Sequence, residues 1–241
     1  MRTFAIGDIH GGLRALEQLI ERIQPDPEDK FIFVGDYVDG WSESAQTIQY
    51  LIELKEKHQC VFVLGNHDLW CSRWLNLGAS NPVWEEHGGK ATKESYQKTG
   101  LLIEQTHRDF FNQLVDYYID DQNRLFIHAG YTSIHGVTKE EYDSNYYFDR
   151  TLWEMVVSID KNLKKDDPDY PKRLKHYHEI FVGHTPTTNY GDNMPMNGAN
   201  VWNVDTGAAF KGSLSALNID TKEVYQSDEV WTLYPNERGR N

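Results

Sequence analysis

The chain has 241 residues, of which 39% are hydrophobic and 13% aromatic, so one domain spanning residues 1–241 can bury a full core. Its 37 acidic and 24 basic residues give a formal charge of −13, which argues against nucleic acid or an anionic membrane surface as a partner. The N-terminus lacks the apolar region of a signal peptide, and Cys60 and Cys71 form no Cys-x-x-Cys pair. We therefore expect a soluble, cytoplasmic protein.

Six times along the chain, a short apolar run leads directly into a polar cluster that contains glycine. Unbroken apolar runs are typical of strands buried on both faces. We therefore predict six strands, each with its polar cluster at the carboxyl end. The segments are TFAIGDIHGG at 3–12, FIFVGDYVDG at 31–40, CVFVLGNHD at 60–68, RLFIHAG at 124–130, EIFVGHT at 179–185 and VWNVDTG at 201–207.

Amphipathic segments lie between the first of these strands. Residues 13–23 carry leucine or isoleucine at 13, 16, 19, 20 and 23, the spacing of one helix face, and residues 44–57 repeat this pattern. Alternating strands and helices through the first 70 residues predict an α/β fold, which binds its ligands at the carboxyl ends of the strands.

Two segments interrupt this alternation. Residues 69–120 are helical and aromatic-rich, and residues 131–178 are polar and tyrosine-rich, so we interpret both as insertions into the single domain. From residue 201 onward, short strand-like runs separated by turn residues predict a more antiparallel sheet edge.

The polar clusters at the strand ends contain side chains that can bind metal ions. Asp8 and His10 are two residues apart, so in an extended chain they point the same way and can share one cation. Asp36 follows the next strand, and its two oxygens can bridge two cations. The predicted sites are one of Asp8, His10 and the shared Asp36, and a second of Asp36, Asn66, His128 and His184.

Mixed nitrogen and oxygen ligands suit manganese, iron or zinc better than magnesium or calcium. Two such ions about 4 Å apart form the clamp that activates water against phosphorus. Each residue alone has a simpler interpretation, since an aspartate after a strand is often a cap and a histidine near an apolar run is often packed. Six such residues, each after a strand-like run and near glycine, favour the joint metal site.

In their order along the chain, GDIHG, GDYVDG, GNHD, HAG and GHT resemble the motifs of the calcineurin-like metallophosphoesterases. The resemblance is to the phosphoprotein phosphatase branch, which includes serine/threonine protein phosphatases and symmetrical diadenosine tetraphosphatases. It implies a four-layer αββα sandwich of two mixed sheets. It also implies two divalent transition-metal ions held by the six ligands above, with manganese expected and iron or zinc as alternatives.

The resemblance also assigns catalytic roles. His67 is similar to the general acid that protonates the leaving oxygen, and Asp39 is similar to the carboxylate that orients this histidine. A phosphoester leaving group needs a proton, and a histidine held in one tautomer can donate it. A hydroxide between the metals would attack phosphorus in line, without a covalent phosphoenzyme.

One residue of the family pattern is absent. Where relatives have GDxVDRG, Gly40 and Trp41 stand in place of Arg and Gly. The missing arginine grips phosphate oxygens with two parallel hydrogen bonds, which a glycine cannot do. Arg150 resembles a second phosphate-gripping arginine of relatives and is our predicted replacement, with Arg73 as the alternative.

Three functions are consistent with this sequence. We expect a serine/threonine phosphatase-like phosphomonoesterase acting on phosphorylated protein, peptide or small phosphoester substrates. The alternative is a symmetrical dinucleoside tetraphosphate hydrolase, in which aromatic side chains would stack on adenine unless they serve as core packing. A catalytically weak, metal-binding scaffold ranks third, because His67 and Asp39 are both present. The aromatic candidates are Trp41, Trp70, Trp74, Trp84 and Tyr96.

Overall fold

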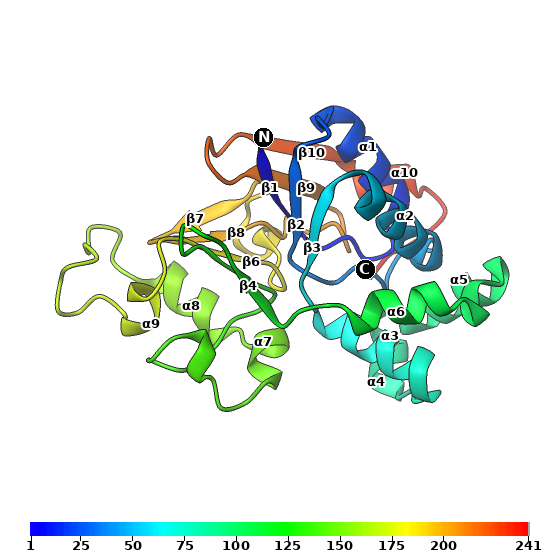
Figure 1. Cartoon of the computed structure of the whole chain (residues 1–241), viewed down its shortest axis with the longest axis horizontal. Helices are drawn as coiled ribbons and strands as arrows, with labels where there is room; N and C mark the ends of the chain where they lie inside the picture. The colour runs from blue at the N-terminus through cyan, green and yellow to red at the C-terminus, as the bar shows by residue number, and fades with distance from the viewer. Residues whose placement is uncertain (241) are drawn as a thin grey trace.

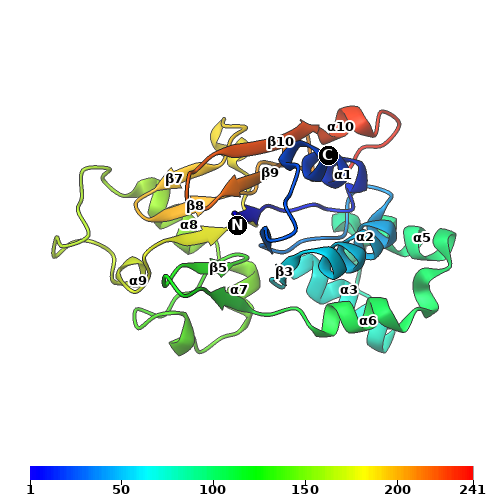
Figure 2. The ribbon, with the colours of Figure 1, turned by 45° about the horizontal axis from the view of Figure 1, so that its top comes forward.

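The protein, seen here as a computed structural model that describes residues 1–240, consists of two five-stranded mixed sheets with helices on their outer sides (Figures 1 and 2). The strand orders are β10-β9-β1-β2-β3 and β4-β5-β6-β8-β7. The α/β fold of two mixed sheets expected from the sequence is confirmed.

The first sheet has a parallel centre and an antiparallel edge. Strands β1 (Thr3–Ile6), β2 (Lys30–Phe33) and β3 (Gln59–Phe62) run parallel. Strand β9 (Ser213–Asn218) pairs antiparallel with β1, and β10 (Val224–Glu229) pairs with β9. Helices α1 (Leu13–Ile23) and α2 (Ser44–Lys57) connect the parallel strands and have the bounds expected from the sequence.

The second sheet repeats this plan. Strands β5 (Leu125–Ile127), β6 (Ile180–Val182) and β8 (Val201–Asn203) run parallel, with β4 (Tyr117–Ile119) and β7 (Met196–Gly198) antiparallel at the two edges. Between β5 and β6 lie the 3₁₀ helix η3 (Val137–Lys139) and helices α7 (Ser144–Phe148), α8 (Thr151–Ser158) and α9 (Lys172–Lys175).

The segment between β3 and β4 is almost entirely helical (Figure 1). It comprises α3 (Asn66–Leu77), α4 (Pro82–Trp84), the π-helical turn η1 (Glu85–Gly89), α5 (Lys90–Thr99), the 3₁₀ helix η2 (Leu101–Ile103) and α6 (Gln105–Asn112). The remaining short elements are η4 (Thr187–Tyr190), after β6, and α10 (Val230–Leu233), after β10.

Successive side chains of the central strands point into different layers of the core. In β1, Phe4 and Ile6 pack with the helices while Ala5 faces the other sheet. In the second sheet, Phe126 and Phe181 face the first sheet and stack with ring centroids 4.8 Å apart. Because both faces of these strands are buried, their sequences are continuously apolar.

All six strands expected from apolar runs are present, as are the two antiparallel strands near the end of the chain. Strands β4 and β7 were not predicted from the sequence. Each has three residues and lies at a sheet edge, where partly exposed side chains break the apolar run.

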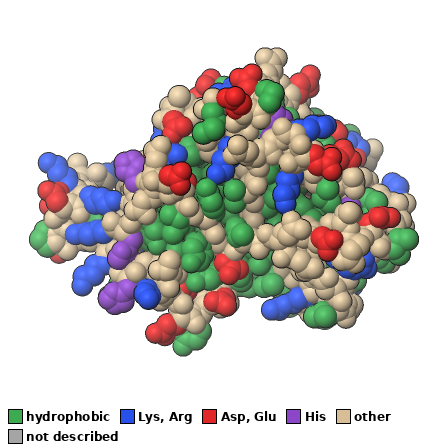
Figure 3. All heavy atoms as spheres, viewed as in Figure 1, with side chains coloured by type: hydrophobic (Ala, Val, Ile, Leu, Met, Phe, Trp, Pro, Cys, Tyr) green, Lys and Arg blue, Asp and Glu red, His purple; other side chains and the backbone are tan. Residues whose placement is uncertain are grey.

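On the face shown in Figure 3, hydrophobic side chains form a central group, and Lys, Arg and His side chains are most frequent at the left end. Acidic side chains are scattered over this face and form no single patch. No helix within residues 1–240 is long and apolar enough to cross a membrane.

Candidate metal centre

The six candidate ligands lie just beyond the carboxyl ends of five parallel strands. Asp8 and His10 follow β1, Asp36 follows β2, and Asn66 follows β3. From the second sheet, His128 follows β5 and His184 follows β6. The ends of parallel strands converge on one edge of a sheet, so the fold gathers residues that lie up to 176 positions apart.

Asp36 lies between the histidines of the two sheets. Its Oδ2 atom is 3.6 Å from His10 Nε2 and 3.4 Å from His128 Nε2. On one side, His10 Nε2 is 3.8 Å from Asp8 Oδ2. The structure thus places Asp36 where one carboxylate faces ligands from both halves of the molecule.

On the other side, His128 Nε2 is 3.2 Å from Asn66 Oδ1 and 3.2 Å from His184 Nδ1. These distances complete the group, so the structure brings all six candidate ligands together. All are buried except His184, which is partly exposed.

The donor chemistry of this group fits divalent metal ions. The Nδ1 atom of His128 lies 2.9 Å from the carbonyl oxygen of Val34, and that of His10 lies 2.8 Å from the carbonyl oxygen of Asp39. In neutral rings Nδ1 therefore carries the proton and Nε2 is left with a lone pair. In that state the nitrogen lone pairs and the carboxylate oxygens face one another, an arrangement that suits a bound cation.

The electrostatics of the buried acids point the same way. Burial, Asp205 and Asp36 together raise the pKa of Asp8 well above its usual range. Burial also raises the pKa of Asp205 to about 6, and the charge of Asp36 adds to this. Buried carboxylates that lie close together are stabilised as anions when positive charge is added.

The backbone is unusual at the same place. Of the eight non-glycine residues with positive φ among residues 1–240, four are candidate site residues: His10 at 53°, Asp36 at 56°, Asp39 at 73° and His184 at 66°. Such left-handed conformations cost free energy and are maintained where the surrounding structure and function require them.

Two motif glycines make room for the carboxylates. A Cβ atom at Gly65 would lie 2.1 Å from Asp36 Oδ1, and one at Gly183 would lie 2.2 Å from Asp8 Oδ1. Any side chain at either position would displace a candidate ligand. This close approach explains why glycine precedes Asn66 and His184 in the sequence.

His67 and Asp39 form a buried pair beside the candidate ligands. His67 Nδ1 is 2.7 Å from Asp39 Oδ2, and both side chains are almost fully buried. The same carboxylate accepts hydrogen bonds from Trp84 Nε1 at 2.6 Å and from Thr92 Oγ1 at 2.6 Å. With Nδ1 directed at Asp39, Nε2 is the ring nitrogen left to exchange a proton with a substrate.

Several residues that support this geometry were not recognised in that role from the sequence. Trp84 was expected only as a possible stacking surface and Thr92 was not singled out, because no motif in the helical segment 69–120 marks either residue. The Asp68 carboxylate accepts hydrogen bonds from the backbone N–H groups of Asp36, Tyr37 and Gly65, which ties the start of α3 to the loop after β2. Asp205 follows β8, so the rule that identified the other acids could have identified it.

Arg150 lines a small pocket at this site. The pocket has a volume of about 130 Å³, and its lining includes His10, His184, Asp205 and Arg240. Arg150 Nη1 donates a hydrogen bond to Thr185 Oγ1 at 3.1 Å, and its side chain is otherwise exposed. The volume is well below that of typical ligand pockets, so it accommodates only part of a nucleotide-sized molecule.

Three of the five proposed aromatic stacking surfaces are part of the core. Trp41, Trp84 and Tyr96 have no exposed surface, so none of them can stack on a base. Trp70 is partly exposed and packs edge-on against His67, with ring centroids 5.2 Å apart. Its ring centroid also lies 5.7 Å from that of the exposed Phe148.

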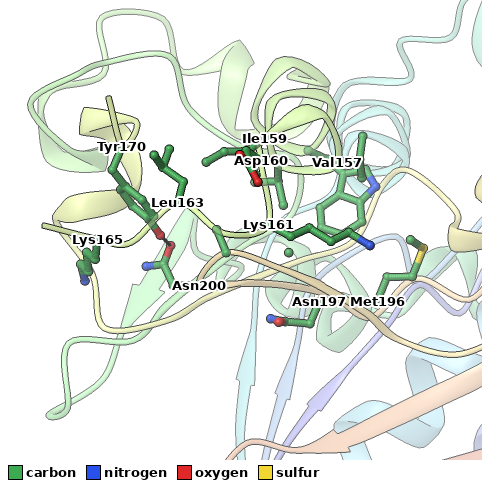
Figure 4. Close-up of a pocket in the computed structure, with 14 residues that line it drawn as sticks. Val157, Ile159, Asp160, Lys161, Leu163, Lys165, Tyr170, Met196, Asn197 and Asn200 are labelled. Atoms are coloured by element: carbon green, nitrogen blue, oxygen red, sulfur yellow. Dashed lines mark hydrogen bonds between the residues drawn. The ribbon is translucent and has the colours of Figure 1, made fainter. Parts of the chain in front are cut away.

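A second cavity, of about 560 Å³, lies on the outer side of the second sheet (Figure 4). Lys161, Tyr170 and Asn200 line it, and Tyr170 Oη donates a hydrogen bond to Asn200. Its described lining residues include none of the candidate site residues, and Asp160 is their only acid. This cavity is separate from the candidate metal centre.

The buried acids and imidazoles at the strand ends of two facing sheets are typical of metal-dependent phosphoesterases. The chain belongs to the calcineurin-like phosphoesterase family, whose sequence profile matches residues 1–209. It is therefore a phosphoester-hydrolysing enzyme of a family that uses divalent metal ions.

Similar curated proteins include bis(5'-nucleosyl)-tetraphosphatases of two types. The asymmetrical bis(5'-nucleosyl)-tetraphosphatase PrpE of Oceanobacillus iheyensis is 26% identical over 243 residues, which cover 92% of this chain and 90% of the relative. The symmetrical bis(5'-nucleosyl)-tetraphosphatase of Pseudomonas putida is 43% identical over 196 residues, which cover 77% of this chain and 56% of the relative.

A solved structure of a protein proposed to be a diadenosine tetraphosphatase has a similar fold, with a TM-score of 0.61 and 19% identity. The match covers 93% of this chain and 92% of that one.

Proposed function

We propose that this protein hydrolyses dinucleoside tetraphosphates with two divalent metal ions. The observation that carries the metal chemistry is the convergence of Asp36 Oδ2 with the Nε2 atoms of His10 and His128 beside the His67–Asp39 pair. The substrate class follows from relatives of both tetraphosphatase types that match most of this chain. This proposal replaces the protein phosphatase function favoured by the sequence motifs, because the curated relatives support the alternative.

Each candidate ligand has a place in this proposal. Asp8, His10 and Asp36 would hold one ion, and Asp36, Asn66, His128 and His184 would hold the other. When bound, the two ions supply an activated water and offset the charge on the phosphoryl oxygens. Manganese suits this mixed donor set, with iron and zinc as alternatives.

His67 would act as the general acid. Asp39 accepts a hydrogen bond from Nδ1 and fixes the tautomer, so that Nε2 delivers the proton to the leaving oxygen. Trp84 and Thr92 hold Asp39 in turn, which keeps its carboxylate aimed at the imidazole. This buried, hydrogen-bonded pair favours an active enzyme over a catalytically weak, metal-binding scaffold.

Arg150 and Trp70 would bind the substrate. Arg150 borders the small pocket beside His184, where its guanidinium can reach phosphate oxygens. Trp70 and Phe148 present a partly exposed aromatic surface beside His67, on which a nucleobase can stack.

The test compares substrates directly. Manganese-loaded protein is incubated with diadenosine tetraphosphate and, separately, with phosphoserine and phosphothreonine peptides, and the products are separated by chromatography. We expect adenine nucleotides from the first substrate: two ADP if cleavage is symmetrical, or ATP and AMP if it is asymmetrical. Intact tetraphosphate together with rapid phosphate release from the peptides would overturn the proposal.

A further inference from the structure

The space beside Gly40 is filled by a distant part of the chain. A Cβ atom at Gly40 would lie 3.3 Å from Arg240 Cγ and 3.1 Å from the carbonyl oxygen of His10. The resemblance to relatives places an arginine at this position. Here an arginine side chain reaches the same place from residue 240.

The segment that carries Arg240 is held by several specific contacts. After α10 the chain turns back toward the sheets (Figure 1), and the Arg240 N–H donates a hydrogen bond to the carbonyl oxygen of Ala209 at 2.9 Å. A Cβ atom at Gly239 would lie 2.7 Å from Trp41 Cζ2, so the backbone there rests on the indole. Glu237 accepts hydrogen bonds from the N–H and hydroxyl of Ser42.

Trp41 forms the base of this arrangement. It is completely buried, donates a hydrogen bond to the carbonyl oxygen of Ala208 at 2.8 Å, and stacks on Tyr234 with ring centroids 5.1 Å apart. Both departures from the family motif thus serve one purpose. Gly40 leaves room for the Arg240 side chain, and Trp41 supports the backbone that presents it.

The Arg240 guanidinium is close to only one acid of the site. Within residues 1–240 it forms no side-chain hydrogen bond or ion pair, and its Cζ atom lies 5.4 Å from the ring centroid of Phe210. The Asp205 carboxyl lines the same pocket, and the charge of Arg240 partly offsets the raised pKa of that carboxyl. Arg240 lines the 130 Å³ pocket together with His10, His184 and Arg150. Two arginines therefore border one small pocket beside the candidate metal ligands.

We propose that Arg240 is a phosphate-binding residue that replaces the arginine absent at Gly40, and that it forms a clamp with Arg150. A guanidinium presents paired N–H donors that match two oxygens of a phosphate group. This inference rests on the proposed function only in that the substrate carries phosphate.

The test uses three full-length variants loaded with manganese: Arg240→Ala, Arg240→Lys and the control Arg238→Ala. Arg238 is an exposed arginine of the same segment and does not line the 130 Å³ pocket. The readouts are the Kd of inorganic phosphate by calorimetry, and KM and kcat for p-nitrophenyl phosphate. Metal content and thermal unfolding check that each variant is intact.

We expect Arg240→Ala to raise the phosphate Kd and the KM by about 10- to 100-fold, because a hydrogen-bonded charge pair is lost. Arg240→Lys should recover part of this, since it keeps the charge but not the paired donors. Arg238→Ala should match the wild type. Wild-type phosphate affinity in a folded, metal-loaded Arg240→Ala protein would refute the proposal.

Both probes are independent of the nucleotide substrate. If diadenosine tetraphosphate is not cleaved but Arg240→Ala weakens phosphate binding, the proposed substrate is wrong and the Arg240 inference stands. If the tetraphosphate is cleaved but Arg240→Ala leaves the phosphate Kd and the KM unchanged, the proposed substrate is supported and the Arg240 inference is wrong.

Discussion

The two sheets contribute different chemistry to the candidate site. Loops after the first sheet supply most of the acids together with the His67–Asp39 pair, whereas the second sheet contributes His128 and His184. Asp36 contacts histidines of both sheets. Neither half contains a complete set of groups, so the proposed two-metal chemistry exists only where the sheets face each other.

The two sides of the site also differ in solvent exposure. On the first side, the helical segment after β3 covers Asp39 with the buried Trp84 and Thr92. On the second side, Arg150 and Phe148 are exposed. The His67–Asp39 pair is thus buried and hydrogen-bonded, whereas Arg150 and Phe148 are accessible to a substrate. A preorganised site requires such an arrangement.

The largest effect should come from the residue that joins the two halves. Asp36→Asn removes the charge that would bridge both ions, so we expect metal content to fall and turnover to drop at least about a thousandfold, the equivalent of several kcal/mol. Metal analysis and steady-state kinetics measure this. Asp228→Asn, at an exposed position, is the control and should behave as wild type. Full metal content and activity in Asp36→Asn would contradict the proposal that Asp36 joins the two metal sites.

His67→Ala should separate proton transfer from metal binding. We expect turnover of an alkyl phosphoester to fall by about 10²- to 10⁴-fold, because its leaving oxygen needs a proton, while metal content is retained. Turnover of an aryl phosphoester with a good leaving group should fall much less. Equal losses on both substrates would remove His67 from the role of general acid.

A smaller effect should follow from removing one of the hydrogen bonds to the Asp39 carboxylate. Trp84→Phe keeps an aromatic ring but removes the Nε1 hydrogen bond to the carboxylate, so we expect about a tenfold lower kcat with unchanged metal content. Trp74→Phe is the matched control, because Trp74 packs against Trp84 without contacting Asp39. Equal kcat values for the two variants would show that the contact from Trp84 does not position the acid.

The smallest effect concerns stability of the helices over the first sheet rather than catalysis. Burial lowers the pKa of His107 from 6.5 to about 4, so the folded protein favours the neutral imidazole. The unfolded chain binds more protons between these values, so this contribution to the free energy of unfolding is complete above about pH 6.5 and is lost as pH falls toward 4.

Denaturant unfolding from pH 7 to pH 4 checks this expectation. His107→Gln should flatten the loss of stability across this range, whereas replacing the exposed His135 with Gln should not. Identical slopes in wild type and His107→Gln would contradict the assignment.

The sequence predicted the central fold well because buried parallel strands carry a strong local signal. The six apolar runs and the helices at 13–23 and 44–57 are set by their own side-chain pattern. The three-residue edge strands β4 and β7 have no such pattern, since pairing with a neighbour rather than local sequence defines them.

The sequence indicated the candidate ligands of the site but not the residues that support them. Residues at strand ends stand out because glycines and apolar runs flank them. Trp84, Thr92 and Arg240 reach the site from segments with no local mark, and only the folded chain shows that they meet Asp39 and Gly40. Burial likewise decided against Trp41 and Tyr96 as base-stacking surfaces.

The most direct measurement is a crystal structure of the manganese-loaded protein with anomalous diffraction at the manganese edge. We expect two peaks about 3.5–4 Å apart, one on each side of the Asp36 carboxylate. The first should lie against Asp8 and His10, and the second against Asn66, His128 and His184. A single peak, or two peaks that do not share Asp36, would contradict the proposal that the two sheets hold one dinuclear centre.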